Sequence, residues 1–364
     1  MNQKVLQGSE DWQSWQWQLR EAITDFAGLA EAFPDFEVPE NAKESLLQRL
    51  PIQITPYYAQ VLQSEPDLQK SLLPSLLELE SAEGEEADPL NEEAQSPFAG
   101  LVHRYPNRVL LYLTEKCAVY CRYCTRGRKV GKKSEELDLY PSLDFNLALD
   151  YLHKDQGINE VILSGGDPLL LSGPDLKDKL SQLFAIPHLQ ILRFSTKLPL
   201  VLPQKITPQF AQIFAGPKPV YMNLHVIHPA ELTPEVAKSL QNLRAAGVVL
   251  SAQTVLLKGI NDDPSLMAEL NQKLLSLGVR PYALYHCDPI LGASHFRTTL
   301  ESGVEILEHL RKTAGGMALP QFVVDPVGGK VTLGPNNLLS VGDSGYELKN
   351  WKGEKVFYPF HLSK

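Results

Sequence analysis

Long apolar runs, a basic N-terminal leader and an excess of basic residues are all missing from this 364-residue sequence. The longest apolar runs, such as Val109 to Leu113, are far too short to cross a bilayer, so we expect no membrane segment. The N-terminus MNQKVLQGSEDWQSW has neither a basic start nor an apolar stretch, which makes the cytoplasm the expected compartment. A net charge of -9 provides no general basic surface, so we expect no nucleic-acid partner.

Cysteine is scarce too, but three of the four cysteines fall within the stretch CAVYCRYC. Four cysteines in a chain of this length do not form a disulfide framework, and a reducing cytosol disfavours disulfides. Cys117, Cys121 and Cys124, in C-x3-C-x2-C spacing, indicate a metal instead. Three thiolates can hold a 4Fe-4S cluster and leave one iron open to a small molecule. Spacing alone leaves two alternatives, a zinc site completed by Cys287 or a histidine, and chance clustering.

Three regions of the chain differ in composition. Residues 1–100 form an N-terminal region that is largely helical in pattern, and its acidic stretch 78–97 is predicted to be an exposed connector. Residues 101–315 alternate short apolar runs with amphipathic stretches. Residues 316–364 form a C-terminal segment, in which 321–333 is predicted as a strand, a tight glycine turn and a second short strand.

The middle region predicts an α/β fold around a parallel sheet. Strands are predicted at 108–114, 160–165, 189–196, 220–227, 248–257 and 280–287. Helices are predicted between them at 143–153, 175–185, 208–215, 234–246, 264–277 and 301–313. Such βα units imply right-handed crossovers and a sheet that is either curled into a partial or complete barrel or laid open. In a barrel the chemistry gathers at the C-terminal ends of the strands, and the cysteines follow the first of them.

A glycine motif, SGGDPL, follows the second predicted strand. Gly165 and Gly166 allow the backbone to approach a ligand closely. Their carbonyls and the carboxylate of Asp167 can accept hydrogen bonds from an ammonium group. On its own such a turn is usually an ordinary loop, and its position beside the cysteines makes it a candidate ligand site.

Two further motifs contain groups suited to a phosphate and an aldehyde. Arg104 and Arg108 flank a turn in HRYPNRVL, where two guanidinium groups suit a phosphate, although exposed arginines are more often simple surface charges. Lys330 ends the glycine turn DPVGGK, where it can form a Schiff base with an aldehyde such as pyridoxal phosphate. Most single lysines are merely solvated, so this motif alone decides little.

Taken together and in this order, the motifs resemble the lysine 2,3-aminomutase family, which are radical S-adenosylmethionine (SAM) enzymes that also carry pyridoxal phosphate. The likeness runs nearly end to end and extends to WQWQLREAI, LPIQITPYY, SAQTVLLKGIND, RPYALYHCD, SHFRT and VVDPVGGK. It implies a partial (β/α)6 radical SAM barrel with a helical N-terminal region. It also implies a short C-terminal segment that carries the pyridoxal phosphate lysine.

The resemblance assigns cofactor roles to the matching residues. The implied ligands of the 4Fe-4S cluster are Cys117, Cys121 and Cys124. The implied contacts of SAM and of the cofactor pocket are Gly165, Gly166, Asp167, Gln253 and His228. The implied pyridoxal phosphate residues are Lys330, which would hold the cofactor as a Schiff base, and Arg108 with Arg104 as a second candidate, which would bind its phosphate. Lys197, in STKLP, stands where the family pattern leads us to expect arginine, and the glycine turn before Lys330 is shorter than expected.

The resemblance also implies a substrate and a reaction. Arg126 would pair with the substrate α-carboxylate, while Asp288 and Asp325 would bind the distal ammonium of L-lysine. The α-amino group would move from C2 to C3 through radical chemistry begun on SAM, giving L-β-lysine. Without the resemblance, both aspartates read as turn residues before a proline. With it, the two acids favour lysine, because a glutamate side chain would meet like charges.

Several partners and alternatives follow from the same resemblance. An electron donor such as flavodoxin or ferredoxin is implied, and so is a homo-oligomer, with a dimer the first expectation. Other reactions within the family are a mutase for arginine, ornithine or glutamate and the lysine mutase that supplies elongation factor P modification. The alternative from another class is a zinc-stabilised binding protein without catalysis.

Overall fold

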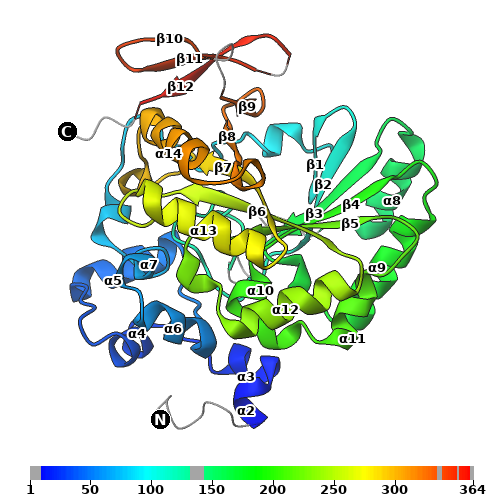
Figure 1. Cartoon of the computed structure of the whole chain (residues 1–364), viewed down its shortest axis with the longest axis horizontal. Helices are drawn as coiled ribbons and strands as arrows, with labels where there is room; N and C mark the ends of the chain where they lie inside the picture. The colour runs from blue at the N-terminus through cyan, green and yellow to red at the C-terminus, as the bar shows by residue number, and fades with distance from the viewer. Residues whose placement is uncertain (1–9, 132–142, 334–337, 351, 361–364) are drawn as a thin grey trace.

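The computed structural model describes residues 10–131, 143–333, 338–350 and 352–360 (Figure 1). Its strands are β1 (Leu101–Tyr105), β2 (Arg108–Thr114), β3 (Glu160–Gly165), β4 (Ile191–Thr196), β5 (Val220–His225), β6 (Val249–Leu256), β7 (Arg280–His286), β8 (Gln321–Val324), β9 (Val331–Thr332), β10 (Leu338–Val341), β11 (Gly345–Lys349) and β12 (Lys355–Pro359). Its α-helices are α2 (Glu10–Gln13), α3 (Trp15–Arg20), α4 (Phe26–Ala32), α5 (Glu40–Arg49), α6 (Pro56–Gln63), α7 (Pro66–Gln69), α8 (Phe145–Lys154), α9 (Gly173–Ala185), α10 (Leu198–Val201), α11 (Pro208–Ala211), α12 (Pro234–Ala245), α13 (Pro264–Ser276) and α14 (Leu300–Thr313). None of the helices within these ranges is long and apolar enough to cross a membrane.

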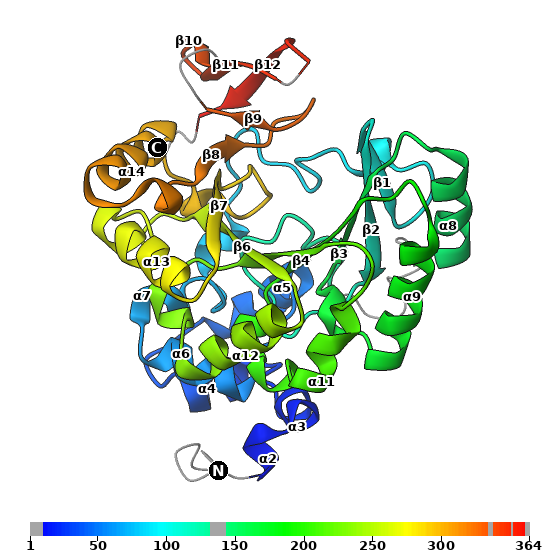
Figure 2. The same cartoon turned by 45° about the vertical axis from the view of Figure 1, so that its right-hand side comes forward.

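The predicted α/β barrel architecture is confirmed. Strands β1 to β9 form one sheet in chain order, and β2 through β8 pair in parallel. The helices α8, α9, α11, α12, α13 and α14 occupy the crossovers and form an outer layer (Figure 2). Because β1 and β9 are antiparallel edge strands, the sheet is an open, partial barrel. The strand, glycine turn and short strand predicted at 321–333 are β8, its following turn and β9.

The sequence does not predict β1 or the C-terminal sheet. β1 is a short strand of mixed polarity that pairs antiparallel with β2 across a tight turn. The separate sheet β10-β11-β12 lies beyond β9 and sits above the barrel rim (Figure 1). Short strands of this kind carry too few apolar residues for their alternation to stand out from the loops around them.

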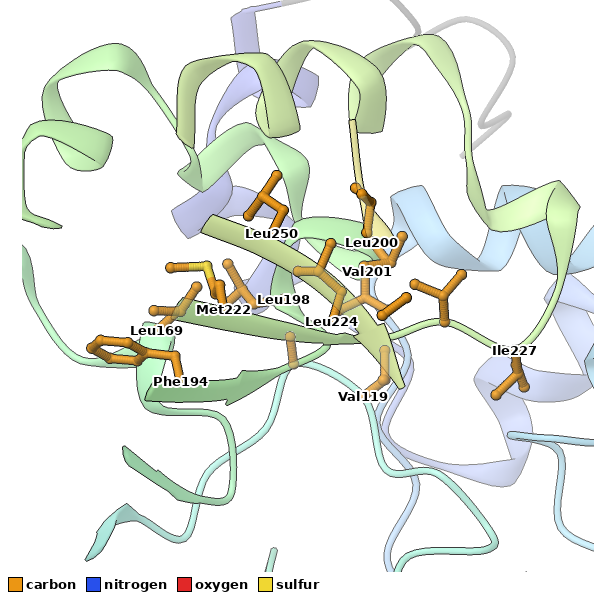
Figure 3. Close-up of a cluster of buried hydrophobic side chains, with 14 of the residues drawn as sticks. Val119, Leu169, Phe194, Leu198, Leu200, Val201, Met222, Leu224, Ile227 and Leu250 are labelled. Carbon is orange, nitrogen blue, oxygen red and sulfur yellow. The ribbon is translucent and has the colours of Figure 1, made fainter. Parts of the chain in front are cut away.

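Side chains alternate between the two faces of the barrel strands, as strand geometry requires. The outward-facing side chains are apolar and buried, and include Val161, Leu163, Leu192, Phe194, Met222 and Leu224. Figure 3 shows Phe194 and Met222 packed in a cluster with Val201 of α10 and with Val119 of the cysteine-containing loop. The inward-facing side chains between them are mostly polar, which leaves the inner face of the barrel for chemistry.

The N-terminal helices share a hydrophobic core with the barrel. One contiguous cluster of buried residues extends from Trp12 to Tyr358. Tyr58 of α6 donates to the carboxylate of Glu231, and the hydroxyl of Thr55 donates to the carbonyl of Val201, both at 2.6 Å. These contacts fasten α6 to the segments that follow β4 and β5.

The stretch 78–97 is exposed along much of its length, as its composition predicts, but two of its acidic side chains are buried. Glu78 and Glu92 are only 3% and 6% exposed. The carboxylate of Glu85 accepts a hydrogen bond from the backbone N–H of Gly292 at 3.1 Å. Glu78 and Glu92 can be buried because each binds a guanidinium group, a pairing that composition cannot reveal.

The loop that carries the cysteines is anchored to the N-terminal region by Arg122. This side chain is fully buried, and its Nε lies 2.8 Å from Oε1 of Glu78. Its Nη1 also donates to the carbonyl of Leu50 at 2.9 Å, and its backbone N–H donates to the carbonyl of Ser71 at 2.9 Å. The position of the cysteines therefore depends on a buried ion pair with the connector.

Breaking this pair should destabilise the protein. Replacement of Arg122 by Ala removes the guanidinium that donates to the Glu78 carboxylate and to the carbonyl of Leu50, and leaves Arg49, 2.6 Å from Oε2 of Glu78, as the remaining cation. The free energy of unfolding should therefore fall by about 1.5–3 kcal/mol. The matched control is Arg20→Ala, because Arg20 is 67% exposed and its pair with Glu21 should contribute less than about 1 kcal/mol. Urea unfolding followed by circular dichroism measures both, and equal stabilities for the two variants would contradict the anchoring role.

Candidate active site

Most of the predicted site residues meet at one cavity on the inner face of the barrel. Those that line it are Cys117, Cys121, Cys124, Arg126, Gly165, Gly166, Asp167, Gln253, Asp288, Asp325 and Lys330. The predicted residues that do not line it are Arg104, Arg108 and His228. The cavity thus brings together segments more than two hundred residues apart, from the cysteine loop to the glycine turn after β8.

The three cysteine thiols share an environment that suits a positively charged iron cluster. Burial, with the nearby thiol of Cys124, raises the pKa of Cys121 to about 11, and burial also raises the pKa values of Cys117 and Cys124. A metal centre supplies the positive charge that such thiols need in order to ionise. Cys287 is buried outside the cavity lining, with its Sγ 3.8 Å from the carbonyl oxygen of Asp288.

The same side chains do not suit a single zinc ion. Among the described residues, no three His, Cys, Asp or Glu side chains form a group that could hold one metal ion. A cluster of four irons spreads its thiolate ligands over more space than one ion does. Three thiols on one cavity wall, with no fourth cysteine among the described residues of that wall, therefore fit a 4Fe-4S cluster that keeps one iron open.

The two glycines after β3 are required by the close approach of the cysteine loop. A Cβ on Gly166 would lie 2.4 Å from the carbonyl oxygen of Lys116, and one on Gly165 would lie 2.5 Å from that of Thr114. Gly165 also has a φ of +107°, which side chains disfavour. Their two segments are joined by the backbone N–H of Gly166, which donates to Thr114 at 2.6 Å. The glycine motif and the cysteine loop therefore form one rigid wall of the cavity.

The carboxylate of Asp167 already accepts several hydrogen bonds from neighbouring residues of the protein. It accepts from the hydroxyl of Thr196 at 2.7 Å and from the backbone N–H groups of Lys197, Leu198 and Leu169 at 2.8, 2.9 and 3.1 Å. Burial raises its pKa, and these hydrogen bonds oppose the rise. Asp167 thus fixes the turn after β3 to the start of α10, which makes it a poor acceptor for a ligand ammonium group. The carbonyls of the glycines remain as the acceptors of this motif.

Lys330 is presented to the cavity by the turn after β8. The two glycines before it have φ values of +102° and +117°, which other residues rarely adopt. The Nζ atom of Lys330 donates to the hydroxyl of Tyr285 at 2.9 Å and lies 3.9 Å from Oδ2 of Asp325. Its backbone N–H donates to the hydroxyl of Tyr105 at 2.9 Å. Tyr285 is a residue that the sequence does not single out.

The two predicted phosphate arginines lie beside the cavity on the β1–β2 hairpin. Arg104 uses Nη1 to bind Oδ1 of Asp325 and Nη2 to donate to the carbonyl of Pro326, both at 2.7 Å. The guanidinium of Arg108 instead lies 3.8 Å from the ring centre of Tyr105. The hairpin therefore holds the end of β8 through Arg104. Among the described residues, Arg108 makes no such bonds to the end of β8.

Asp288 and Asp325 follow the neighbouring strands β7 and β8. Oδ1 of Asp288 is buried and has no hydrogen-bond partner among the described residues. Burial and the nearby charge of Asp325 raise the pKa of Asp288. At this end of the cavity, the carboxylate of Asp325 is therefore paired with Arg104, whereas Oδ1 of Asp288 has no partner among the described residues.

Arg126 lies close to the cysteines and is held by three side chains. Its Nη2 lies 2.7 Å from Oε1 of Glu92, its Nε donates to the hydroxyl of Tyr112 at 2.9 Å, and its Nη1 donates to Ser164 at 3.3 Å. Burial favours the neutral form of Glu92, but the charge and hydrogen bond of Arg126 outweigh it and hold the pKa at about 2. Glu92 and Tyr112 are further site residues that the sequence does not single out.

Of His225 and the predicted His228, only His225 lines the cavity. His228 begins a short 3₁₀ helix, where its backbone N–H donates to Glu231 at 3.0 Å. Nε2 of His225 lies 2.8 Å from both the hydroxyl of Ser195 and Nε2 of Gln253. Burial is the main cause that lowers the pKa of His225 to about 3, so the imidazole is neutral. Alternation along β5, with His225 on the inward face, is the sequence signal that identifies it.

Lys197 also reaches this part of the cavity. It forms a buried ion pair with Glu231 and donates to the backbone carbonyl of His225 at 3.1 Å. The lysine in place of the expected arginine is therefore paired with a carboxylate and a carbonyl of the protein.

Comparison with known proteins identifies the family. Residues 111–270 match the model of the radical SAM superfamily, and residues 307–360 match the lysine-2,3-aminomutase model. An L-lysine 2,3-aminomutase of Clostridium subterminale is 40% identical over 353 residues, which cover 96% of this chain and 84% of that enzyme. The chain belongs to the lysine 2,3-aminomutase family. As a family member it is an enzyme that uses a 4Fe-4S cluster, SAM and pyridoxal phosphate.

Two other members of the lysine 2,3-aminomutase family act on different amino acids, although their sequence identities to this chain are similar. An L-lysine 2,3-aminomutase of Methanococcus maripaludis is 41% identical over 354 residues, covering 94% of this chain and 81% of that enzyme. A glutamate 2,3-aminomutase of Clostridioides difficile is 36% identical over 358 residues, covering 97% of this chain and 84% of that enzyme. The choice of amino acid therefore has to be argued from the site.

The close glycine contact can be tested by adding one methyl group. In a Gly166→Ala variant the new Cβ would meet the carbonyl of Lys116, so the cysteine loop must shift and iron loading after reconstitution should fall by at least about half. Gly316→Ala is the control, since its Cβ would meet nothing within 4 Å. Iron content per chain, measured beside the circular dichroism spectrum, gives the answer. Full iron loading in the Gly166→Ala variant would contradict the contact.

Proposed function

We propose that this enzyme is an L-lysine 2,3-aminomutase, which moves the α-amino group of L-lysine from C2 to C3 and gives L-β-lysine. The observation that carries the proposal is the buried, unpartnered Oδ1 of Asp288 beside Asp325, in the cavity that also contains Arg126 and Lys330. A cation at this position removes the cost of a buried carboxylate without a partner. The distal ammonium of lysine is such a cation.

The charges of the cavity match the two ends of lysine. Arg126 supplies N–H donors for the α-carboxylate, while Asp288 and Asp325 receive the ammonium at the far end of the side chain. Glutamate would bring a second carboxylate to the two aspartates, at a cost of several kcal/mol. The alternatives with arginine or ornithine also carry a distal cation, so the length of the side chain has to discriminate against them.

Each cofactor has a set of residues that would hold it. The open-iron cluster would be held by the three cysteines, with SAM against the carbonyls of Gly165 and Gly166. Lys330 would hold pyridoxal phosphate covalently, and Tyr285 orients its Nζ. When bound, the cluster and SAM supply the radical that removes hydrogen from C3, and pyridoxal phosphate carries the migrating nitrogen. The protein orients these groups and excludes water from the barrel interior.

Two assignments differ from the pattern that the sequence alone implies. Arg108 is the better candidate for the phosphate of pyridoxal phosphate, because both terminal nitrogens of Arg104 are engaged at the end of β8. His225 and Gln253, rather than His228, are the candidates for polar contacts to SAM, since both line the cavity. Arg104 then acts on the substrate site by holding Asp325.

Partners and compartment are proposed from the needs of the chemistry. Reduction of the cluster requires an electron from outside the chain, which a flavodoxin or ferredoxin could supply. Thiols that must stay reduced favour the cytoplasm. A homodimer is the proposed assembly.

The substrate proposal is tested by product analysis. Protein reconstituted with iron, sulfide, SAM and pyridoxal phosphate, and reduced with dithionite, should convert L-lysine to L-β-lysine faster than it converts arginine, ornithine or glutamate. Chromatography with mass detection identifies each β-amino acid. Absence of β-lysine, or a preference for another of these substrates, would overturn the choice of lysine.

The raised pKa of Asp288 predicts the pH dependence of lysine binding. Below that pKa the carboxyl is protonated and neutral, so the Michaelis constant for lysine should fall as pH rises through it. Asp288→Asn should raise the Michaelis constant by at least about ten-fold and remove this pH dependence. Initial rates across the mildly acidic to mildly alkaline range measure it. Asp178→Asn, at an exposed site on α9, should keep the original profile, and an unchanged profile in the Asp288→Asn enzyme would refute the role.

The covalent role of Lys330 is tested by borohydride trapping. Reduction of the protein loaded with pyridoxal phosphate should attach a pyridoxyl group to the peptide that contains Lys330, as peptide mass mapping detects. Lys330→Ala should lose this adduct, whereas Lys355→Ala, at a side chain that is 72% exposed, should keep it. An adduct that persists in the Lys330→Ala protein would exclude the assignment.

A further inference from the structure

The carboxylate of Glu92 is buried at the site, although the proposed reaction assigns it no role. It belongs to the segment before β1, outside the barrel strands, yet its carboxylate is buried against Arg126. Its Oε1 lies 2.7 Å from Nη2 of Arg126, and its Oε2 accepts from Nε at 3.3 Å. Tyr112 of β2 also donates its hydroxyl to Oε2 of Glu92. The carboxylate therefore lies along the side edge of the guanidinium, formed by Nε and Nη2.

The remaining donors of Arg126 lie on a different edge. A guanidinium has five N–H groups in a fixed plane, and Glu92 and Tyr112 receive those on the side edge. Nη1 gives one hydrogen to Ser164 at 3.3 Å. One N–H on each terminal nitrogen then has no recorded partner among the described residues. The outer edge of the guanidinium, formed by Nη1 and Nη2, is the other edge that can present two N–H groups to the two oxygens of a carboxylate.

We propose that Glu92 is a positioning residue that turns the outer edge of Arg126 toward the α-carboxylate of the substrate. This inference rests on the proposed function, in which Arg126 receives that carboxylate. Without Glu92, the guanidinium could turn within its plane, because Ser164 and Tyr112 each provide only one neutral hydroxyl group as an acceptor. The ring of Tyr112, whose centre lies 5.1 Å from the guanidinium carbon, does not fix which edge faces the cavity. Glu92 itself does not touch the reacting atoms.

The segment that carries Glu92 also reaches the other end of the substrate site. The backbone N–H of Glu86 donates to the carbonyl of Pro289 at 2.9 Å, and that of Leu291 donates to Glu86 at 3.0 Å. These contacts hold the loop that directly follows Asp288. One continuous stretch of chain therefore contacts both the carboxylate end and the ammonium end, which supports a role in setting the geometry of the site.

The test compares two ligands that differ only in the carboxylate. Holoenzyme without reductant is titrated by calorimetry with L-lysine and with 1,5-diaminopentane, which has no carboxylate. Glu92→Gln keeps the size of the side chain but removes its charge, so affinity for lysine should fall by about ten-fold while affinity for diaminopentane stays unchanged. The matched control is Glu93→Gln, because Glu93 is adjacent, 53% exposed and paired with Arg128 rather than Arg126. It should change neither affinity.

Equal weakening of both ligands in the Glu92→Gln enzyme would indicate a structural role and overturn the proposal. Tighter binding of lysine would overturn it as well, because Glu92 would then compete with the substrate for Arg126. In Glu92→Ala, added formate should restore lysine affinity at least partly by occupying the vacated edge, and no rescue counts against the positioning role.

An Arg126→Gln enzyme separates this inference from the proposed function. If that change leaves the preference for lysine over diaminopentane intact, Arg126 is not the carboxylate partner and the proposed site itself fails. If it removes the preference while Glu92→Gln does not, only the positioning role of Glu92 fails. Loss of the preference in both variants, with none in the Glu93→Gln control, supports both.

Discussion

The buried pair of Arg122 and Glu78 is the interaction on which the site most depends. It fixes a loop of irregular backbone, which carries three thiols, to a segment that precedes the barrel. The glycines after β3 then press against the start of the same loop, so its position is determined from two sides. A cluster with an open iron needs this rigidity, since its ligands come from a loop rather than from a strand or helix.

Inside the barrel, the side chains that match the two charged ends of a lysine molecule lie at separate places on the cavity wall. Arg126 lies beside the cysteines, and the two aspartates lie at the ends of neighbouring strands on the other part of the cavity wall. Buried charges of this kind are costly unless they are paired. Glu92 pairs with Arg126, and Asp325 pairs with Arg104. Asp288, whose Oδ1 has no partner among the described residues, can therefore bind a cation of the substrate.

Much of the barrel fold could be predicted from the sequence, because strands of β-branched and aromatic residues alternate regularly with capped helices. The cysteine and glycine motifs and Lys330 could be placed for the same reason, as each follows a predicted strand. Glu92 could not, because an acidic stretch reads as solvated until its guanidinium partners are known. The choice between His225 and His228 also needed the structure, because the predicted strand 220–227 did not show that β5 ends at His225 and that His228 caps the following 3₁₀ helix.

The central claim is that lysine binds with its α-carboxylate on Arg126 and its distal ammonium on Asp288. A crystal structure of the reconstituted enzyme, grown without reductant and with L-lysine bound, measures this directly. The account predicts a carboxylate within hydrogen-bond distance of the terminal nitrogens of Arg126 and an ammonium nitrogen at the same range from Asp288. Lysine bound in the reverse orientation, or with its ammonium in contact with neither aspartate, would contradict it.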